Sequence, residues 1–157
     1  MGRNAVGEKL EAPTKAADLY SWARQQAELL RAGRLAEIDP LAIAEEIADV
    51  GEEQYDKLES ALRIVMLHLL KWDHQPERRN RSWTLSILEH RKRALRQLRK
   101  NPGLKSRVDE ALEGAYEDAR LEASSETGLA LKTFPAECPF VYAEIMDRPV
   151  VWPGDEP

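Results

Sequence analysis

The chain has 157 residues, of which 43% are hydrophobic and 32% are charged, and its net charge at neutral pH is −5. This balance excludes an intrinsically disordered chain and predicts a single packed domain. The longest apolar run, residues 64–70, is far shorter than the roughly 20 residues of a membrane-spanning helix. The single cysteine, Cys138, excludes an intramolecular disulfide. Because the N-terminal region has no apolar signal segment, we expect a cytoplasmic protein.

The first predicted helix is marked by apolar residues at spacings of three and four. Thr14 and Asp18 are the alternative N-caps, since both side chains can accept a hydrogen bond from a free backbone amide. Gly33 supplies the stop, so the helix is predicted to end near residue 32.

The second predicted helix begins at Asp39-Pro40, an N-cap carboxylate followed by a proline at the first helical position. An apolar stripe follows on one side of a helical projection and predicts a long central helix over residues 40–73. The stripe consists of Ile43, Ile47, Gln54, Leu58, Leu62, Val65, Leu69 and Trp72.

Three further helices are indicated by caps and prolines downstream. The predicted boundaries are Ser82 and Asn101 for the third helix, Asn101-Pro102 and Gly128 for the fourth, and Pro139 and Met146 for the fifth. The sequence therefore predicts an all-α fold, a bundle of four longer helices and one short C-terminal helix. This helical domain is predicted over residues 18–147, between a flexible N-terminal segment, 1–17, and a C-terminal tail, 148–157.

Charge is distributed unevenly along the chain. Residues 77–107 contain eleven Lys or Arg and two Glu, a net charge of +9, whereas residues 37–59 contain nine Asp or Glu and one Lys, a net charge of −8. One hypothesis is nucleic-acid or anion binding through the basic segment 78–107. The alternative, which we favour because the whole chain is acidic, is that the second and third helices lie antiparallel and that acid faces base.

Histidine and carboxylate residues suggest a weaker alternative, a metal-dependent enzyme. His68 and His74 are six residues apart and so miss the spacing of three or four that lets two imidazoles on a helix share one ion. Glu45 and Asp49 do have the i, i+4 spacing of helical carboxylate sites, but a solvated helix face explains them as well. We expect no metal or other cofactor.

The connection between the second and third helices combines guanidinium groups, two indoles and a helix N-terminus, which together suit an anion or a partner. The candidate residues are Lys71, Trp72, Gln75, Arg78, Arg79, Arg81, Ser82 and Trp83. The alternative is that these side chains pack and pair among themselves and set the angle between the two helices. In that case at least two of the three arginines make intramolecular bonds.

An ordered set of motifs carries a family resemblance. The motifs are Trp22 with Gln26, Leu29-Leu30-Arg31, Glu45-Glu46-Ile47 followed by Gly51, His68-Leu69-Leu70-Lys71-Trp72, Gln75-Pro76-Glu77-Arg78-Arg79, Arg81-Ser82-Trp83, Tyr116-Glu117-Asp118-Ala119-Arg120, Phe134-Pro135 and Cys138-Pro139. Over about residues 18–147 the chain resembles the bacterial family called domain of unknown function 29. The resemblance implies a helical intracellular bacterial protein and carries over no catalytic residue.

No glycine-rich phosphate loop, zinc-protease motif or serine elbow is present in the sequence. We therefore expect an interaction or regulatory protein without catalytic activity. A second copy of the chain and a different protein are both open as partners, nucleic acid is less favoured, and no membrane partner is expected.

Overall fold

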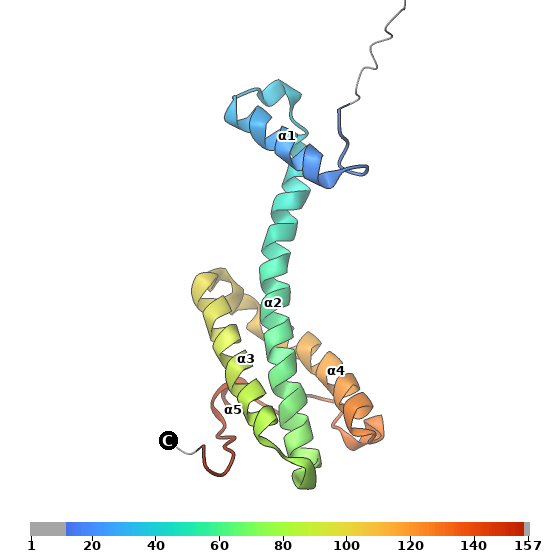
Figure 1. Cartoon of the computed structure of the whole chain (residues 1–157), viewed down its shortest axis with the longest axis vertical. Helices are drawn as coiled ribbons and strands as arrows, with labels where there is room; N and C mark the ends of the chain where they lie inside the picture. Colours follow the sequence, from blue (N-terminus) through green and yellow to red (C-terminus); the bar gives the residue numbers. More distant parts are fainter. Residues whose placement is uncertain (1–11, 156–157) are drawn as a thin grey trace, which may run out of the picture. The chain divides into compact units, whose positions relative to one another are not determined.

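The computed structural model describes residues 12–155, in which all the regular secondary structure is helical and no strand occurs. Four longer helices and one short helix follow one another, as the sequence predicts (Figure 1). Their bounds are α1 (Leu19–Arg31), α2 (Pro40–His74), α3 (Arg81–Lys100), α4 (Val108–Thr127) and α5 (Tyr142–Asp147). The predicted N-terminal segment and C-terminal tail lie partly outside the described residues, at 1–11 and 156–157.

The chain divides into two compact units, residues 1–50 (unit 1) and residues 51–157 (unit 2), and the division falls within α2. Unit 1 consists of α1, a short 3₁₀ turn at Leu35–Glu37 and the first part of α2. Unit 2 consists of the rest of α2 with α3, α4 and α5. Each unit is described by itself below.

In unit 1, capping side chains explain where the two helices begin. Asp18, and not Thr14, caps α1, because its carboxylate accepts the amide hydrogen of Ser21 at 3.0 Å. Asp39 caps α2 through the amide of Ala42 at 3.1 Å, as predicted. The backbone amide of Asp39 in turn donates to the buried side-chain oxygen of Gln26 at 2.8 Å, which ties the start of α2 to α1.

In unit 2, the core forms around the second part of α2, with α3 and α4 packed against it. The mostly apolar run of α2, residues 64–70, is largely buried as predicted. Met66, Leu69 and Leu70 have no exposed surface, whereas Ile64 and His68 are half-buried. The other large side chains that are fully buried are Phe134, Leu58, Leu62, Val65, Ile87, Ile145 and Thr84. The predicted antiparallel pairing of α2 and α3 is confirmed by two contacts. The side-chain amide of Gln97 donates to the carbonyl of Gln54 at 3.0 Å, and the ammonium group of Lys71 lies 4.7 Å from the ring centroid of Trp83.

The C-terminal part of unit 2 is held by one buried cation. Arg91 of α3 donates hydrogen bonds to the carbonyls of Ile145 (2.7 Å), Arg148 (2.9 Å) and Glu144 (3.2 Å). These carbonyls lie at the end of α5, where a helix leaves its last acceptors unpaired. Val150 is also buried in this core, so residues beyond α5 contribute to it.

Three predicted helix starts are wrong. The cap of α3 is Asn80 and not Ser82, because Asn80 has an extended backbone and its side-chain oxygen accepts the amide hydrogen of Trp83 at 3.2 Å. The helix α4 begins at Val108 and not at Pro102, since residues 102–107 form a 3₁₀ helix.

The side chain of Asn101, which was the predicted cap, does not cap the 3₁₀ helix that precedes α4. Its side-chain amide instead donates back to the carbonyl of Gln97 at 3.3 Å. The helix α5 begins at Tyr142 and not at Pro139, because Val141 before it is extended. The backbone amide of Val141 is satisfied by the carboxylate of Glu144 at 3.0 Å.

Candidate functional site

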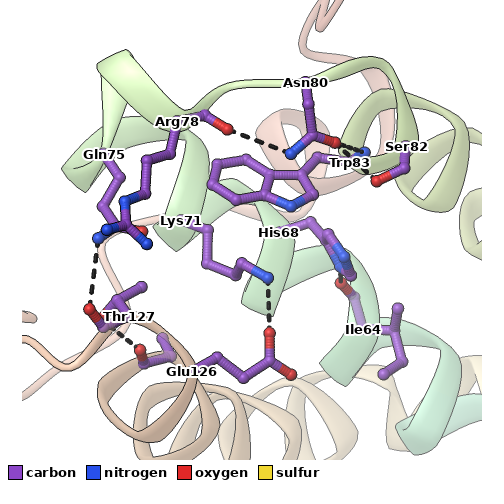
Figure 2. Close-up of polar contacts among 11 residues, drawn as sticks. Ile64, His68, Lys71, Gln75, Arg78, Asn80, Ser82, Trp83, Glu126 and Thr127 are labelled. Carbon is purple, nitrogen blue, oxygen red and sulfur yellow. Dashed lines mark hydrogen bonds and ion pairs between the residues drawn. The ribbon is translucent and has the colours of Figure 1, made fainter.

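The predicted anion corner lies where α2 ends, a 3₁₀ turn at Pro76–Arg78 follows and α3 begins (Figure 2). Its most buried cation, Lys71, pairs with the carboxylate of Glu126 on α4 at 2.5 Å. The same ammonium group lies 4.7 Å from the ring centroid of Trp83, so an ion pair and a cation–π contact both hold it. Lys71 therefore joins the three longer helices of unit 2.

The neighbouring polar side chains of the corner are also bonded within the chain. The side-chain amide of Gln75 donates, at 3.4 Å, to the carbonyl of Thr127, the last residue of α4. Arg79 donates to the carbonyl of Trp72 at 2.8 Å and lies over its ring, 4.7 Å from the centroid. Arg81 pairs with Asp155 at 2.7 Å.

The N-terminus of α3 is occupied by its own cap. The side-chain oxygen of Asn80 accepts from both the amide of Trp83 and the hydroxyl of Ser82, the latter at 2.6 Å. Within the described residues, Arg78 is the one charged residue of the corner whose side chain has no partner. Leu69 is buried and two of the three arginines make intramolecular bonds, both as expected of a corner that sets the helix angle. Trp72, which was expected to be buried, is only half-buried.

The weak metal candidates are not gathered into one place. The imidazole Nδ1 of His68 is 2.9 Å from the carbonyl oxygen of Ile64, and burial lowers the pKa of that imidazole. The ring of His74 contacts the ring of Phe134 edge-on, with centroids 4.9 Å apart.

The two carboxylate candidates lie in unit 1, where Glu45 pairs with Lys15 at 2.8 Å. No ion pair involves Asp49 within residues 12–155. Over the same residues no group of three His, Cys, Asp or Glu is placed to hold a metal ion.

The basic segment is partly paired and partly free. Arg93 pairs with Glu89, and Arg107 pairs with both Glu52 (3.1 Å) and Glu110 (2.9 Å). Arg107 also lies over the ring of Tyr55, 3.8 Å from its centroid. In the part of the chain that the structure describes, Arg78, Lys92, Arg96, Arg99, Lys100 and Lys105 have no ion-pair partner.

The acidic face of α2 and the basic face of α3 meet only indirectly. Both line a polar crevice of about 570 Å³ in unit 2, to which α2 contributes Glu53 and Asp56 and α3 contributes Arg93 and Arg96. Among the residues described, no ion pair joins α2 to α3 directly. Opposite charges therefore face one another across the crevice, while the outer cations of α3 stay unneutralised.

Unit 1 has an apolar hollow that is not among the sequence predictions. It is a groove of about 1050 Å³ between α1 and the first part of α2. Its exposed large apolar residues are Leu19, Tyr20, Leu30, Ile47 and Val50. The spacing of these residues was visible in the sequence, but periodicity shows only that a helix face is apolar and not what covers it.

A family model, domain of unknown function DUF29, matches residues 16–150 of the chain. The chain belongs to this DUF29 family. No curated protein and no solved structure matched the chain.

The DUF29 match covers parts of both units. It begins before α1 and ends at Val150, so the apolar groove and the core around α2 both belong to the family domain. The predicted family resemblance is confirmed over slightly more of the chain than the expected residues 18–147. No described helix of this DUF29 protein is both long and apolar enough to cross a bilayer.

Proposed function

We propose that this DUF29 protein is an interaction protein of the bacterial cytoplasm, and that it pairs with a second copy of itself through the α1–α2 groove of unit 1. The single observation that carries the proposal is the large open apolar surface of that groove. The bacterial and cytoplasmic parts of the proposal rest on the sequence and the family resemblance. The proposal that two copies pair through the groove is argued below from burial, helix geometry and charge.

Unit 1 buries very little apolar surface of its own. Trp22 is the only apolar residue among the described residues of unit 1 that is buried, at 5% exposure. Ile47 is 68% exposed and Val50 60% exposed on α2, and Leu19 is 48% exposed on α1. The helix pair spans residues 19–50, which is fewer than the roughly 40 residues below which a unit seldom buries enough surface to be stable alone, so it is expected to need a partner.

The geometry of the groove suits another helix. Two neighbouring helices that expose apolar residues at helical spacing form a trough into which a third amphipathic helix packs. The helix α1 has 13 residues and so is about 20 Å long. In a two-fold dimer each copy supplies both a trough and a matching helix, and four helices enclose one core.

Charge supports a second copy as the occupant. The helix α1 carries Arg24 and Arg31 against one acid, Glu28, a net charge of +1. The part of α2 within unit 1 carries three acids and no cation; Lys15 pairs with Glu45 and Glu46, and Asp49 has no ion pair within the described residues. In the two-fold interface that we propose, α1 of one copy packs against α2 of the other, so that opposite charges meet and like charges are kept apart.

The test is sedimentation velocity of the whole chain across a range of protein concentrations. We expect a reversible dimer, and we expect Ile47→Asp to weaken dimerisation by at least about tenfold because it would bury an unpaired carboxylate at the interface. Leu121→Asp is the matched control, since Leu121 of α4 is 57% exposed and lies outside the groove. It should leave the dimer unchanged.

A charge reversal tests the two-fold arrangement itself. Arg24→Glu should weaken the dimer, and adding Asp49→Arg should restore part of the affinity because opposite charges again face one another. A wild-type chain that stays monomeric throughout the range would overturn the proposal. So would a dimer that Ile47→Asp leaves intact.

A further inference from the structure

A second unpartnered face lies in unit 2, on the outer side of α3. Leu85, Leu88 and Leu95 are 45%, 46% and 53% exposed, although α3 is a long helix packed against the core on its other side. With Lys92 and Arg99 they recur at spacings of three and four, so the five residues share one stripe of the helix. The stripe is apolar with cations set into it.

A groove continues this stripe at the C-terminal end of α3. It has a volume of about 700 Å³ and is lined by apolar side chains from α3, α4 and α5, among them Leu95, Val108 and Tyr142. Its charged lining residues are the two cations Arg99 and Lys105 and one acid, Asp109. A ligand that fits this groove is therefore apolar in the middle and carries negative charge where it meets the two cations.

The cations of this face are not neutralised within the chain. Residues 92–105 contain six Lys or Arg and no Asp or Glu. Only Arg93 of the six is in an ion pair within the described part of the chain, with Glu89. Like charges held this close on one helix repel one another, and an anionic partner would remove that repulsion.

We propose that the α3 face, defined as Leu85, Leu88, Lys92, Leu95, Arg99 and Lys105, binds an acidic amphipathic helix of a partner protein. The leucines take up the apolar side of that helix, and the cations pair with the carboxylates that flank it. Residues 85–99 extend over about 21 Å of helix, so a partner segment of about four turns covers the stripe. This surface is separate from the groove of unit 1 and does not depend on self-association.

The same cations would also attract a nucleic acid, but the side chains between them favour a protein. Proteins that bind single strands place exposed aromatic rings beside the cations so that bases can stack on them. Along the stripe the residues between the cations are leucines, and the groove at its end offers a single aromatic ring, Tyr142, which is 36% exposed. Trp83 is buried, and Trp72 is half-buried under Arg79. Exposed leucines gain nothing from a phosphate backbone, whereas an amphipathic helix buries them.

The test is fluorescence anisotropy of the whole chain with a labelled helical peptide of about four turns, leucines on one side and glutamates beside them. A peptide of the same composition in scrambled order controls for charge alone, and an oligothymidine strand of similar charge is the nucleic-acid arm. We expect the amphipathic peptide to bind at least about tenfold more tightly than the scrambled one. Both Leu95→Ser and Arg99→Glu should weaken that binding by a similar factor.

Two control variants separate this face from other effects. Lys132→Glu makes the same charge change as Arg99→Glu on an exposed residue of a different segment and should leave binding unchanged. Ile47→Asp should also leave peptide binding unchanged, so the failure of self-association and the failure of this proposal are told apart. Circular dichroism checks that each variant stays folded.

Three results would overturn the proposal. The first is equal binding of the amphipathic and scrambled peptides, which would mean attraction by charge alone. The second is tighter binding of oligothymidine with a steep loss of affinity as salt rises, which would assign the face to nucleic acid. The third is peptide binding that Leu95→Ser leaves intact.

Discussion

The two parts of α2 contain the same kind of apolar stripe but bury it differently. From Tyr55 to Leu70 the stripe is covered by α3, α4 and α5, and Leu58, Leu62 and Val65 have no exposed surface. In unit 1 the stripe faces an open groove, and Ile47 remains 68% exposed. One helix therefore serves as a core element in unit 2 and as a surface element in unit 1.

The difference teaches that amphipathicity indicates a face to be covered and leaves open what covers it. Unit 2 supplies its own cover, since α3 and α4 return along α2 after short connections. Unit 1 supplies only α1, and one helix of 13 residues leaves part of the stripe open. For a small helical unit, an uncovered apolar face of this kind typically marks an interaction surface.

The largest expected effect compares one alanine substitution in each part of α2. Leu62→Ala should lower the free energy of unfolding by about 2–5 kcal/mol, because it removes fully buried methyl groups and leaves a cavity. Ile47→Ala should change the free energy of unfolding of the monomer by less than about 0.5 kcal/mol, because the side chain is mostly exposed. Urea denaturation at low protein concentration measures both.

The comparison between the two parts of α2 fails if the two substitutions cost the same. A large effect of Ile47→Ala that grows with protein concentration would instead report the dimer, since association stabilises the folded chain by mass action. Leu121→Ala on the exposed surface of α4 provides the baseline for a solvent-facing apolar residue.

A smaller effect is expected at Gly51, the residue of α2 at which unit 2 begins. A methyl group added there would meet no atom within 4 Å. Gly51→Ala should therefore raise the free energy of unfolding by about 0.5–1 kcal/mol, because alanine loses less conformational entropy in a helix. Thermal denaturation followed by circular dichroism measures the change.

The matched control is Gly128→Ala, which replaces the glycine after α4, whose φ of +73° is in the left-handed region. This substitution should destabilise the chain by about 1 kcal/mol. If Gly51→Ala were also destabilising, the backbone at Gly51 would need a freedom that a regular helix does not require.

The smallest expected effect is a pH dependence specific to unit 2. Burial lowers the pKa of His68 below its ordinary value of about 6.5, so the unfolded chain binds the proton first as the pH falls. The stability that follows from the neutral imidazole is fully present above about pH 6.5 and is lost as the pH falls below it. Urea denaturation of wild type and His68→Gln between about pH 7.5 and 5 measures it, and the variant should lose less stability on acidification.

His90→Gln is the control for this experiment. The imidazole Nδ1 of His90 lies 2.9 Å from the carbonyl oxygen of Ser86, the same contact that His68 makes with Ile64. The His90→Gln variant therefore measures what the loss of such a contact costs by itself. Identical slopes of stability against pH in wild type and His68→Gln would show that the imidazole of His68 is not held neutral by the fold.

Local signals were enough to predict most helix ends and not all of them. Asp18, Asp39 and Gly128 lie where their capping chemistry predicts. Ser82 was the wrong choice because Asn80, two residues earlier, offers the same acceptor and an extended backbone. Choosing between two adequate caps depends on where the chain turns, which the cap itself does not determine.

The candidate corner shows the same division between what was and was not predictable. Three of its candidate residues, Lys71, Gln75 and Trp83, lie near one another. What they bond to was not foreseen, because Glu126 and Thr127 come from α4, more than 50 residues later in the chain. The use of this corner as an anion site stays a prediction.

The sequence by itself determined the helical class, the order of the helices and the family, because all three depend on local periodicity, capping residues and motif order. Only the tertiary structure decided which apolar faces are covered and which charges are paired. Covering Leu62 and neutralising Lys71 both require residues that are distant in the chain. The uncovered faces beside Ile47 and Leu95 follow from that same packing, and both proposals rest on them.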